Sequence, residues 1–219
     1  MLELGPGDSL FSALIAKAFG GSEAYLVDVG PFARRDFGIY ESMTAFLRER
    51  GLCTTPFEVC ASLEEMLEVC SAHYLTGGLK SLREIPTQSA DLVWSHGVMQ
   101  SIRRREFLAT LRELRRIQRP DGVGSHLIEL KDCLSGALNN LRFRERIWES
   151  DIVAKSGFYT NRIRCTEMLG LFREAGFNVE VLEVQRWDAL PTPRQALAMP
   201  FRALPEEELN ISALDVVLH

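Results

Sequence analysis

The sequence lacks the features that mark secreted, metal-binding and membrane-spanning proteins. Its five cysteines lie far apart and include no C-x-x-C pair, so neither a zinc knuckle nor a redox dithiol is indicated. This usage is typical of reduced thiols in a cytoplasmic protein. No apolar run approaches the ~20 residues of a membrane-spanning helix, and no signal peptide opens the chain. We therefore expect a cytoplasmic protein without a membrane partner.

An excess of positive charge is also missing. The net charge of −5 gives no reason to expect a nucleic acid as partner. No two histidines are spaced with carboxylates as a metal site requires, so we expect no metal. The content of 46% hydrophobic and 25% charged residues is ordinary for a globular protein. With 219 residues and no internal repeat, the chain predicts a single domain over residues 1–219.

Short apolar runs alternate with helical patterns along most of the chain. Strands are expected at residues 2–4, 25–29, 74–76, 91–95, 123–130, 177–184 and 213–218. Helices are expected at residues 10–20, around Met43 to Leu47, from Ser62, at 103–118 and from Thr166. This alternation predicts an α/β fold with a doubly wound, mostly parallel sheet, and the last two strands favour an antiparallel closing pair.

Local signals set the expected ends of these elements. Asp8 or Ser9 is expected to cap the first helix, and Thr166 the last. Ser62 and Glu65 have the spacing of a capping box. Residues 120–122 (Pro-Asp-Gly) predict a turn before the fifth strand. Residues 185–210 contain four prolines and are expected to be mostly loop.

The glycine turn after the first strand is the first candidate binding site. Gly5 and Gly7 let the backbone turn without Cβ clashes, and the N–H groups of the following helix start can bind a polar or anionic ligand. Asp28, about 20 residues later, is placed to accept the hydroxyls of a ribose; capping of the following loop is its alternative role. Ser95 and His96 follow the fourth strand at the same predicted sheet edge. This spacing fits a nucleoside-containing cofactor.

Two cofactor classes compete for such a turn. A nicotinamide dinucleotide site needs G-x-G-x-x-G, and Leu10 stands where its third glycine belongs. Glu3, two residues before Gly5, would repel a pyrophosphate but could attract an ammonium group. A nicotinamide-dependent oxidoreductase is therefore disfavoured.

Four segments together resemble a known family. They are Glu3-Leu4-Gly5-Pro6-Gly7, Asp28, the run from Ile85-Pro86 into Asp91–Ser95, and Leu114–Gly122. In order and spacing they resemble the S-adenosylmethionine-dependent methyltransferases with a Rossmann-like seven-stranded fold, in particular the type 11 methyltransferase domain. The resemblance covers residues 2–130, and the closing strands also suit that family.

The resemblance implies S-adenosyl-L-methionine as cofactor and S-adenosyl-L-homocysteine as product. Glu3 would bind the methionine ammonium, Asp28 would hold the ribose, and Ser95 would lie beside the methionine part. The complete set of implied cofactor-binding residues is Glu3, Gly5, Gly7, Ser9, Asp28, Gly78, Leu79 and Ser95. Within it, Gly78 and Leu79 would border the adenine.

Candidate catalytic and substrate residues come from the second half of the chain. His96 and His126 are candidate general bases, with structural or cofactor-contacting roles as alternatives. The segment 131–164 is expected to be a substrate lid with a helical middle, in which Asn140, Tyr159 and Arg162 are candidate acceptor-binding residues. A contact in a homodimer, or a packed insertion, is the alternative role of this segment.

The run Arg103-Arg104-Arg105 is interpreted as a charged surface rather than an anion site.

The function expected from these residues is methyl transfer from S-adenosyl-L-methionine to a small-molecule acceptor, most simply at oxygen. An alternative is an inactive relative that keeps the fold for binding or scaffolding. Members of the family usually carry a helical segment before the first strand, whereas here the first strand follows Met1 directly.

Overall fold

The computed structural model describes residues 1–219 and contains a seven-stranded sheet in the order β3-β2-β1-β4-β5-β7-β6. Strand β1 pairs in parallel with β2 and β4, and β2 pairs in parallel with β3. Strand β7 runs antiparallel to both β5 and β6. The predicted mostly parallel sheet with an antiparallel closing strand is therefore confirmed.

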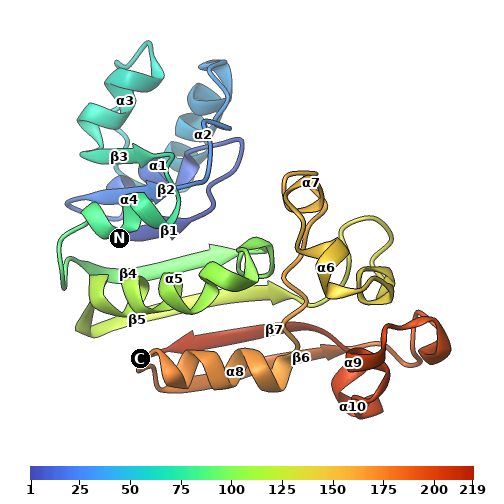
Figure 1. The fold of residues 1–219 in the computed structure, drawn as a ribbon. Helices are drawn as coiled ribbons and strands as arrows, with labels where there is room; N and C mark the ends of the chain where they lie inside the picture. Colours follow the sequence, from blue (N-terminus) through green and yellow to red (C-terminus); the bar gives the residue numbers. More distant parts are fainter. The chain divides into compact units, whose positions relative to one another are not determined.

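The chain divides into two compact units, which are described separately (Figure 1). Unit 1 comprises residues 1–94 and 117–122, and unit 2 comprises residues 95–116 and 123–219. No helix in either unit is long and apolar enough to cross a membrane.

Unit 1 contains the predicted strands and helices of the first half of the chain, together with helix α4, which the sequence did not indicate. Its elements are β1 (Leu2–Leu4), α1 (Phe11–Ala18), β2 (Ala24–Val27), α2 (Gly38–Glu49), α3 (Leu63–Val69), β3 (Ala72–Leu75), α4 (Leu79–Glu84) and most of β4 (Ala90–His96).

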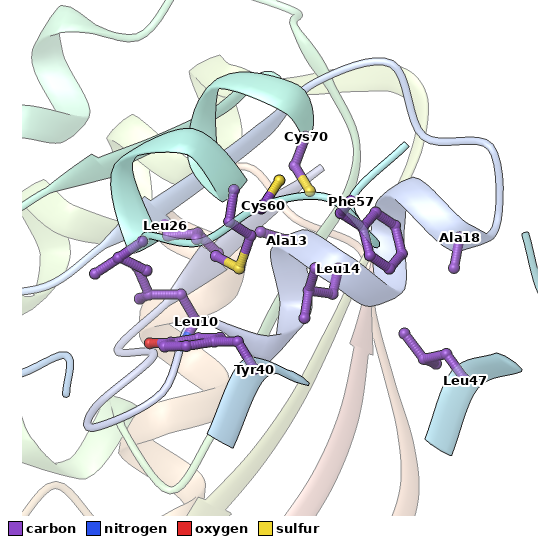
Figure 2. Close-up of a cluster of buried hydrophobic side chains, with 12 residues drawn as sticks. Leu10, Ala13, Leu14, Ala18, Leu26, Tyr40, Leu47, Phe57, Cys60 and Cys70 are labelled. Atoms are coloured by element: carbon purple, nitrogen blue, oxygen red, sulfur yellow. The ribbon is translucent and has the colours of Figure 1, made fainter. Parts of the chain in front are cut away.

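The core of unit 1 forms where α1 packs on β2 and α2 (Figure 2). Leu10, Leu14 and Leu26 are fully buried there, together with Tyr40 of α2. Phe46, an apolar residue of the predicted helix around Met43 to Leu47, is 43% exposed. Its ring stacks under the Arg50 guanidinium at 3.4 Å, so the residue serves as a surface contact.

Helix α1 begins differently from the prediction. Neither Asp8 nor Ser9 caps it: Leu10 occupies the N-cap position, and no side chain caps the helix there. Leu10 is drawn into the core, and its N–H donates to the Tyr40 hydroxyl at 3.4 Å. The capping box at α3 is confirmed in part: Ser62 Oγ accepts the Glu65 N–H at 3.2 Å, but the Glu65 carboxylate accepts the backbone N–H of Ala61 rather than that of Ser62.

The predicted turn at residues 120–122 is also wrong, since β5 (Gln118–Glu129) runs through it without a break. Gly122 is required by packing rather than by a turn. A Cβ atom there would approach the carbonyl oxygens of Ala90 and Asp91 in β4 to 3.0 Å. The glycine therefore lets the start of β5 lie directly against β4.

Unit 2 contains the predicted long helix, the irregular segment and the closing strands. Its further elements are η1 (Met99–Ser101), α5 (Arg104–Ile117), η2 (Asn139–Arg142), α6 (Glu145–Trp148), α7 (Asp151–Ala154), α8 (Cys165–Glu174), β6 (Val179–Arg186), η3 (Arg194–Ala196), α9 (Met199–Arg202), α10 (Glu206–Leu209) and β7 (Ile211–Leu218). The stretch 185–210, expected to be mostly loop, thus carries three short helical turns.

Two aromatic rings join the helices of unit 2. Phe107 of α5 and Phe172 of α8 are both fully buried, with ring centroids 6.3 Å apart. Helix α8 packs against β6 and β7 (Figure 1). Thr166 does not cap α8, because Arg164 holds the N-cap position. The Glu208 carboxylate instead accepts the Thr166 backbone N–H at 2.8 Å, so the free N–H of the first turn is satisfied from α10.

The segment 131–164 is tied down by polar contacts within unit 2. Asn161 Nδ2 donates to the carbonyl oxygens of Met99 and Ile102 at 2.9 and 3.1 Å. Arg103 pairs with Asp151 at 2.6 Å and donates to the Glu149 carbonyl. The arginine run is therefore only in part the exposed surface we expected, because Arg103 holds this segment in place.

Arg164 joins three parts of the unit 2 backbone. It is buried, and its guanidinium donates to the carbonyl oxygens of Leu130, Glu208, Leu209 and Ile211 at 2.5–3.1 Å. Burial lowers the pKa of Arg164 to about 10, so the group stays charged at neutral pH.

Replacement of Arg164 should therefore leave several buried carbonyl groups without a donor. We expect Arg164→Met to lower the free energy of unfolding by about 3 kcal/mol or more, measured by urea denaturation. Arg186→Met is the matched control, because Arg186 is exposed and donates to the single carbonyl of Glu207 at 3.0 Å. Its effect should stay within about 0.5 kcal/mol. Equal effects of the two substitutions would contradict the bridging role of Arg164.

Candidate functional site

The carboxyl ends of β1 and β2 bring the glycine turn to Asp28 within unit 1. The parallel register places Leu4 beside Val27, and the Gly5 N–H continues this pairing by donating to the Val27 carbonyl at 2.8 Å. Gly5 and Gly7 have φ angles of +72° and +69°, which side-chain-bearing residues rarely adopt. The two glycines therefore turn the chain back over the end of the sheet.

The Asp28 carboxylate is held by backbone N–H groups on both oxygens. Oδ2 accepts the Gly7 N–H at 3.1 Å, and Oδ1 accepts the Val29 N–H at 2.7 Å. The Asp28 carbonyl in turn accepts the Gly78 N–H at 2.8 Å. Three segments far apart in the sequence thus meet around one half-buried carboxylate whose remaining lone pairs can accept further hydrogen bonds.

Glu3 supplies a second carboxylate in the same unit, but a buried one. It is only 7% exposed, and its Oε2 atom has no hydrogen-bond partner. Burial raises the pKa of Glu3 to about 7; a hydrogen bond to Ser12 opposes this shift, and the negative charge of Asp28 adds to it. A buried acid without a counter-ion is suited to a cationic group that the protein itself does not provide.

The remaining predicted cofactor residues of unit 1 lie at element ends. Ser9 is half-buried between the glycine turn and α1. Gly78 has a φ of +55°, and a Cβ atom on it would lie 3.0 Å from Val29 Cγ1. Leu79 is the half-buried first residue of α4.

Sequence reasoning missed residues that shape the surroundings of Asp28. The Tyr74 hydroxyl accepts the backbone N–H groups of Phe32 and Ala33 at 2.9 and 3.2 Å and donates to the Gly30 carbonyl at 3.1 Å. It thereby fixes the loop that follows Asp28. Val29 is 78% exposed beside Asp28, although it is apolar. The sequence placed Val29 inside the predicted strand 25–29, so its exposure, like the Tyr74 contacts, depends on the fold.

In unit 2, Ser95 and His126 form a buried pair. Ser95 Oγ lies 2.8 Å from His126 Nδ1, and the two residues are 2% and 1% exposed. Burial lowers the pKa of His126 to about 3, so the imidazole is neutral at physiological pH. His96, at the end of β4, is exposed. The two histidines predicted as candidate general bases therefore differ in environment, since His126 is buried and His96 is exposed.

The three predicted acceptor-binding residues also differ in their contacts. Asn140 is buried and donates to Thr160 Oγ1 at 2.8 Å. The Tyr159 hydroxyl donates to the Glu149 carboxylate at 2.9 Å and accepts the Arg104 N–H at 3.1 Å. Arg162 donates to the Phe143 carbonyl at 2.7 Å, while its Nε has no partner.

Known proteins share the fold but little of the sequence. No family model matches the chain, and no curated protein matches it significantly. An S-adenosylmethionine-dependent methyltransferase from Mesorhizobium loti is 18% identical, with a TM-score of 0.51 over 100% of this chain and 89% of that one. An arsenic(III) S-adenosylmethionine methyltransferase from Chlamydomonas reinhardtii is 17% identical, with a TM-score of 0.59 over 99% and 62%. The chain thus has the Rossmann-like fold of S-adenosylmethionine-dependent methyltransferases, as predicted.

The buried charge of Glu3 should destabilise the folded protein near neutral pH. Because its folded pKa of about 7 lies above the ordinary value of 4.5, the folded state binds the proton more tightly, and stability falls as pH rises between these values. We expect Glu3→Gln to raise the free energy of unfolding at pH 8 by up to ~3 kcal/mol, with little effect at pH 4. Urea denaturation at both pH values measures this difference; a gain of equal size at pH 4 would contradict it.

His126 should act in the opposite direction. Its folded pKa of about 3 lies below the ordinary value of 6.5, so the unfolded state binds the proton more tightly, and stability is lost as pH falls from 6.5 toward 3. We expect His126→Asn to flatten the acid limb of the stability curve. His73→Asn, at an exposed histidine paired with Glu23, is the control. An unchanged acid limb in the His126 variant would show that the imidazole is not buried in the neutral form.

Proposed function

We propose that the chain binds S-adenosyl-L-methionine and transfers its methyl group to an oxygen atom of a small-molecule acceptor. One observation carries the proposal: the Glu3 carboxylate in β1 has an Oε2 atom without a partner, and the Asp28 carboxylate directly after β2 is held by the N–H groups of Gly7 and Val29. The first is suited to an ammonium group and the second to a pair of vicinal hydroxyls, and S-adenosyl-L-methionine carries both. The fold shared with methyltransferases supports the same cofactor.

The residues of unit 1 would each recognise one part of this cofactor. Glu3 would bind the ammonium group in its ionised form, with Gly5, Gly7 and Ser9 bringing backbone close to the methionine carboxylate and sugar. Asp28 would accept the two ribose hydroxyls. The exposed apolar surface of Val29, with Gly78 and Leu79, would border the adenine.

The sulfonium of the bound cofactor supplies an activated methyl group, so the protein mainly needs to position an acceptor in line with it. A hydroxyl acceptor also needs a base. His96 is our candidate, because histidine is the most common general base and this one is exposed at the end of β4. His126, buried and neutral, would act as a positioning residue that orients the Ser95 hydroxyl. Asn140, Tyr159 and Arg162 remain our candidates on the acceptor side.

The alternatives have less support. A nicotinamide-dependent enzyme would place its pyrophosphate beside two carboxylates, which repel it. An inactive binding protein would still use the cofactor site, and the comparisons do not favour it. A cytoplasmic location and a homodimer stay predictions from the sequence.

Calorimetric titration with S-adenosyl-L-homocysteine tests the cofactor site directly. We expect micromolar or tighter binding by the wild-type protein and no response to NAD. Asp28→Ala should weaken binding at least ~10-fold, because hydrogen bonds to a charged group are lost. Asp36→Ala is the matched control, since Asp36 is an exposed acid of the same unit that accepts one backbone N–H, from Gly38. Wild-type affinity in the Asp28 variant, or no binding by the folded wild-type protein, would refute the proposal.

A further inference from the structure

Unit 2 has a partly open cavity of about 780 Å³, and Arg162, our candidate on the acceptor side, is among its lining residues. Its walls come from residues 143–145, from residues 162–167 at the start of α8 and from the 198–208 segment. Most of the lining of the last segment is apolar, with Ala198, Met199, Phe201 and Leu204 among it. A volume of this size is typical of small-molecule sites.

Arg162 is the unusual residue in this lining. It is only 6% exposed, and it has a φ of +59°, a conformation that is costly for a residue with a side chain. Its guanidinium carbon lies 5.6 Å from the ring centroid of Trp148 and 5.2 Å from that of Phe201. The guanidinium therefore packs against two aromatic rings.

The guanidinium of Arg162 is also incompletely used. Its one hydrogen bond goes from Nη1 to the Phe143 carbonyl at 2.7 Å, its Nε is buried without a partner, and it forms no ion pair. The positive charge is therefore left uncompensated by any carboxylate in contact with it. A desolvated guanidinium in this state binds a planar anion strongly, because two parallel N–H···O bonds can form.

The other charges of the lining are already engaged or exposed. Arg104 pairs with Glu167, and the Glu208 carboxylate is bonded to the backbone N–H and hydroxyl of Thr166. Arg164 is occupied by backbone carbonyls. Arg144 and Glu145 are exposed neighbours of opposite sign. Arg162 thus remains as the one buried cation in the lining that can take a new anion.

We propose that this cavity binds a small amphipathic monocarboxylate, with its carboxylate on Arg162 and its apolar body against Met199, Phe201 and Leu204. A single carboxylate matches the single buried guanidinium of the lining that has no carboxylate in contact with it. A phosphate dianion is disfavoured, because Glu145, Glu167 and Glu208 also line the cavity and would repel a dianion about twice as strongly as a monoanion. All residues of this site belong to unit 2, so it shares none with the cofactor residues of unit 1. Arg162 is also our candidate on the acceptor side of the proposed methyl transfer, and the ligand class named here deepens that assignment.

Two naphthalene probes of equal shape test the charge requirement by calorimetry. We expect the wild-type protein to bind 2-naphthylacetate at least about tenfold more tightly than 2-naphthylacetamide, the neutral amide. Arg162→Gln should remove this preference. Arg144→Gln, which replaces an exposed arginine of the same lining, should keep it.

A second variant tests the cavity itself while it leaves Arg162 in place. Ala198→Leu adds volume to the lining, so it should weaken both probes about tenfold or more. Equal binding of acid and amide by the wild-type protein, or a preference that survives in Arg162→Gln, would overturn the proposal and leave Arg162 with a purely structural role. Tighter binding of 2-naphthyl phosphate than of 2-naphthylacetate would overturn the choice of a monoanion.

Binding of S-adenosyl-L-homocysteine is measured on the same variants. Its affinity should not change in Arg162→Gln or Ala198→Leu, so failure of the carboxylate site and failure of the cofactor site give different results. Unchanged naphthylacetate binding by Asp28→Ala completes this separation.

Discussion

The parallel pairing of β1 with β2 is the constraint on which the candidate cofactor site depends. The strand register is extended by two hydrogen bonds. The Gly5 N–H donates to the Val27 carbonyl, and the Gly7 N–H donates to the Asp28 carboxylate. Each is possible only because the preceding one fixes the position of the chain. Asp28 is therefore held by the backbone of the sheet end rather than by other side chains, and its position does not depend on rotamers elsewhere. The buried carboxylate of Glu3 comes from the same strand, so a single pairing places both acids.

Much of unit 1 could be predicted because its signals are local. A glycine turn after an apolar run and an acid about 20 residues later can be recognised within a single strand–helix–strand unit, without knowledge of distant contacts. The sequence could not show that Glu3 lacks a partner, since that depends on the burial created by the folded chain. Nor could it show Tyr74, whose hydroxyl joins a loop more than 40 residues away. The N-cap of α1 was misread because core packing of Leu10 outweighed the capping propensity of its polar neighbours.

Unit 2 was less predictable, because long-range polar contacts organise it. Arg103, Asn161 and Arg164 each satisfy backbone carbonyls or acids that are distant in sequence. Side chains of this type are ambiguous in a sequence, since an arginine on a surface and an arginine that bridges loops follow the same local pattern. The prolines between residues 185 and 210 indicated loop, yet Pro200 and Pro205 sit at helix starts, where a proline is well tolerated.

The ionisation state of Glu3 on β1 affects the thermodynamics of ligand binding. With a pKa of about 7, roughly half of the molecules carry a proton on Glu3 at neutral pH. In those molecules a cation that binds at this site displaces the proton, so ligand binding is coupled to proton release. The measured heat of binding would then vary with the ionisation enthalpy of the buffer, and ligand occupancy would decrease as the surroundings become acidic. A single acid in a buried strand thereby makes the binding of a cationic ligand depend on the surrounding pH.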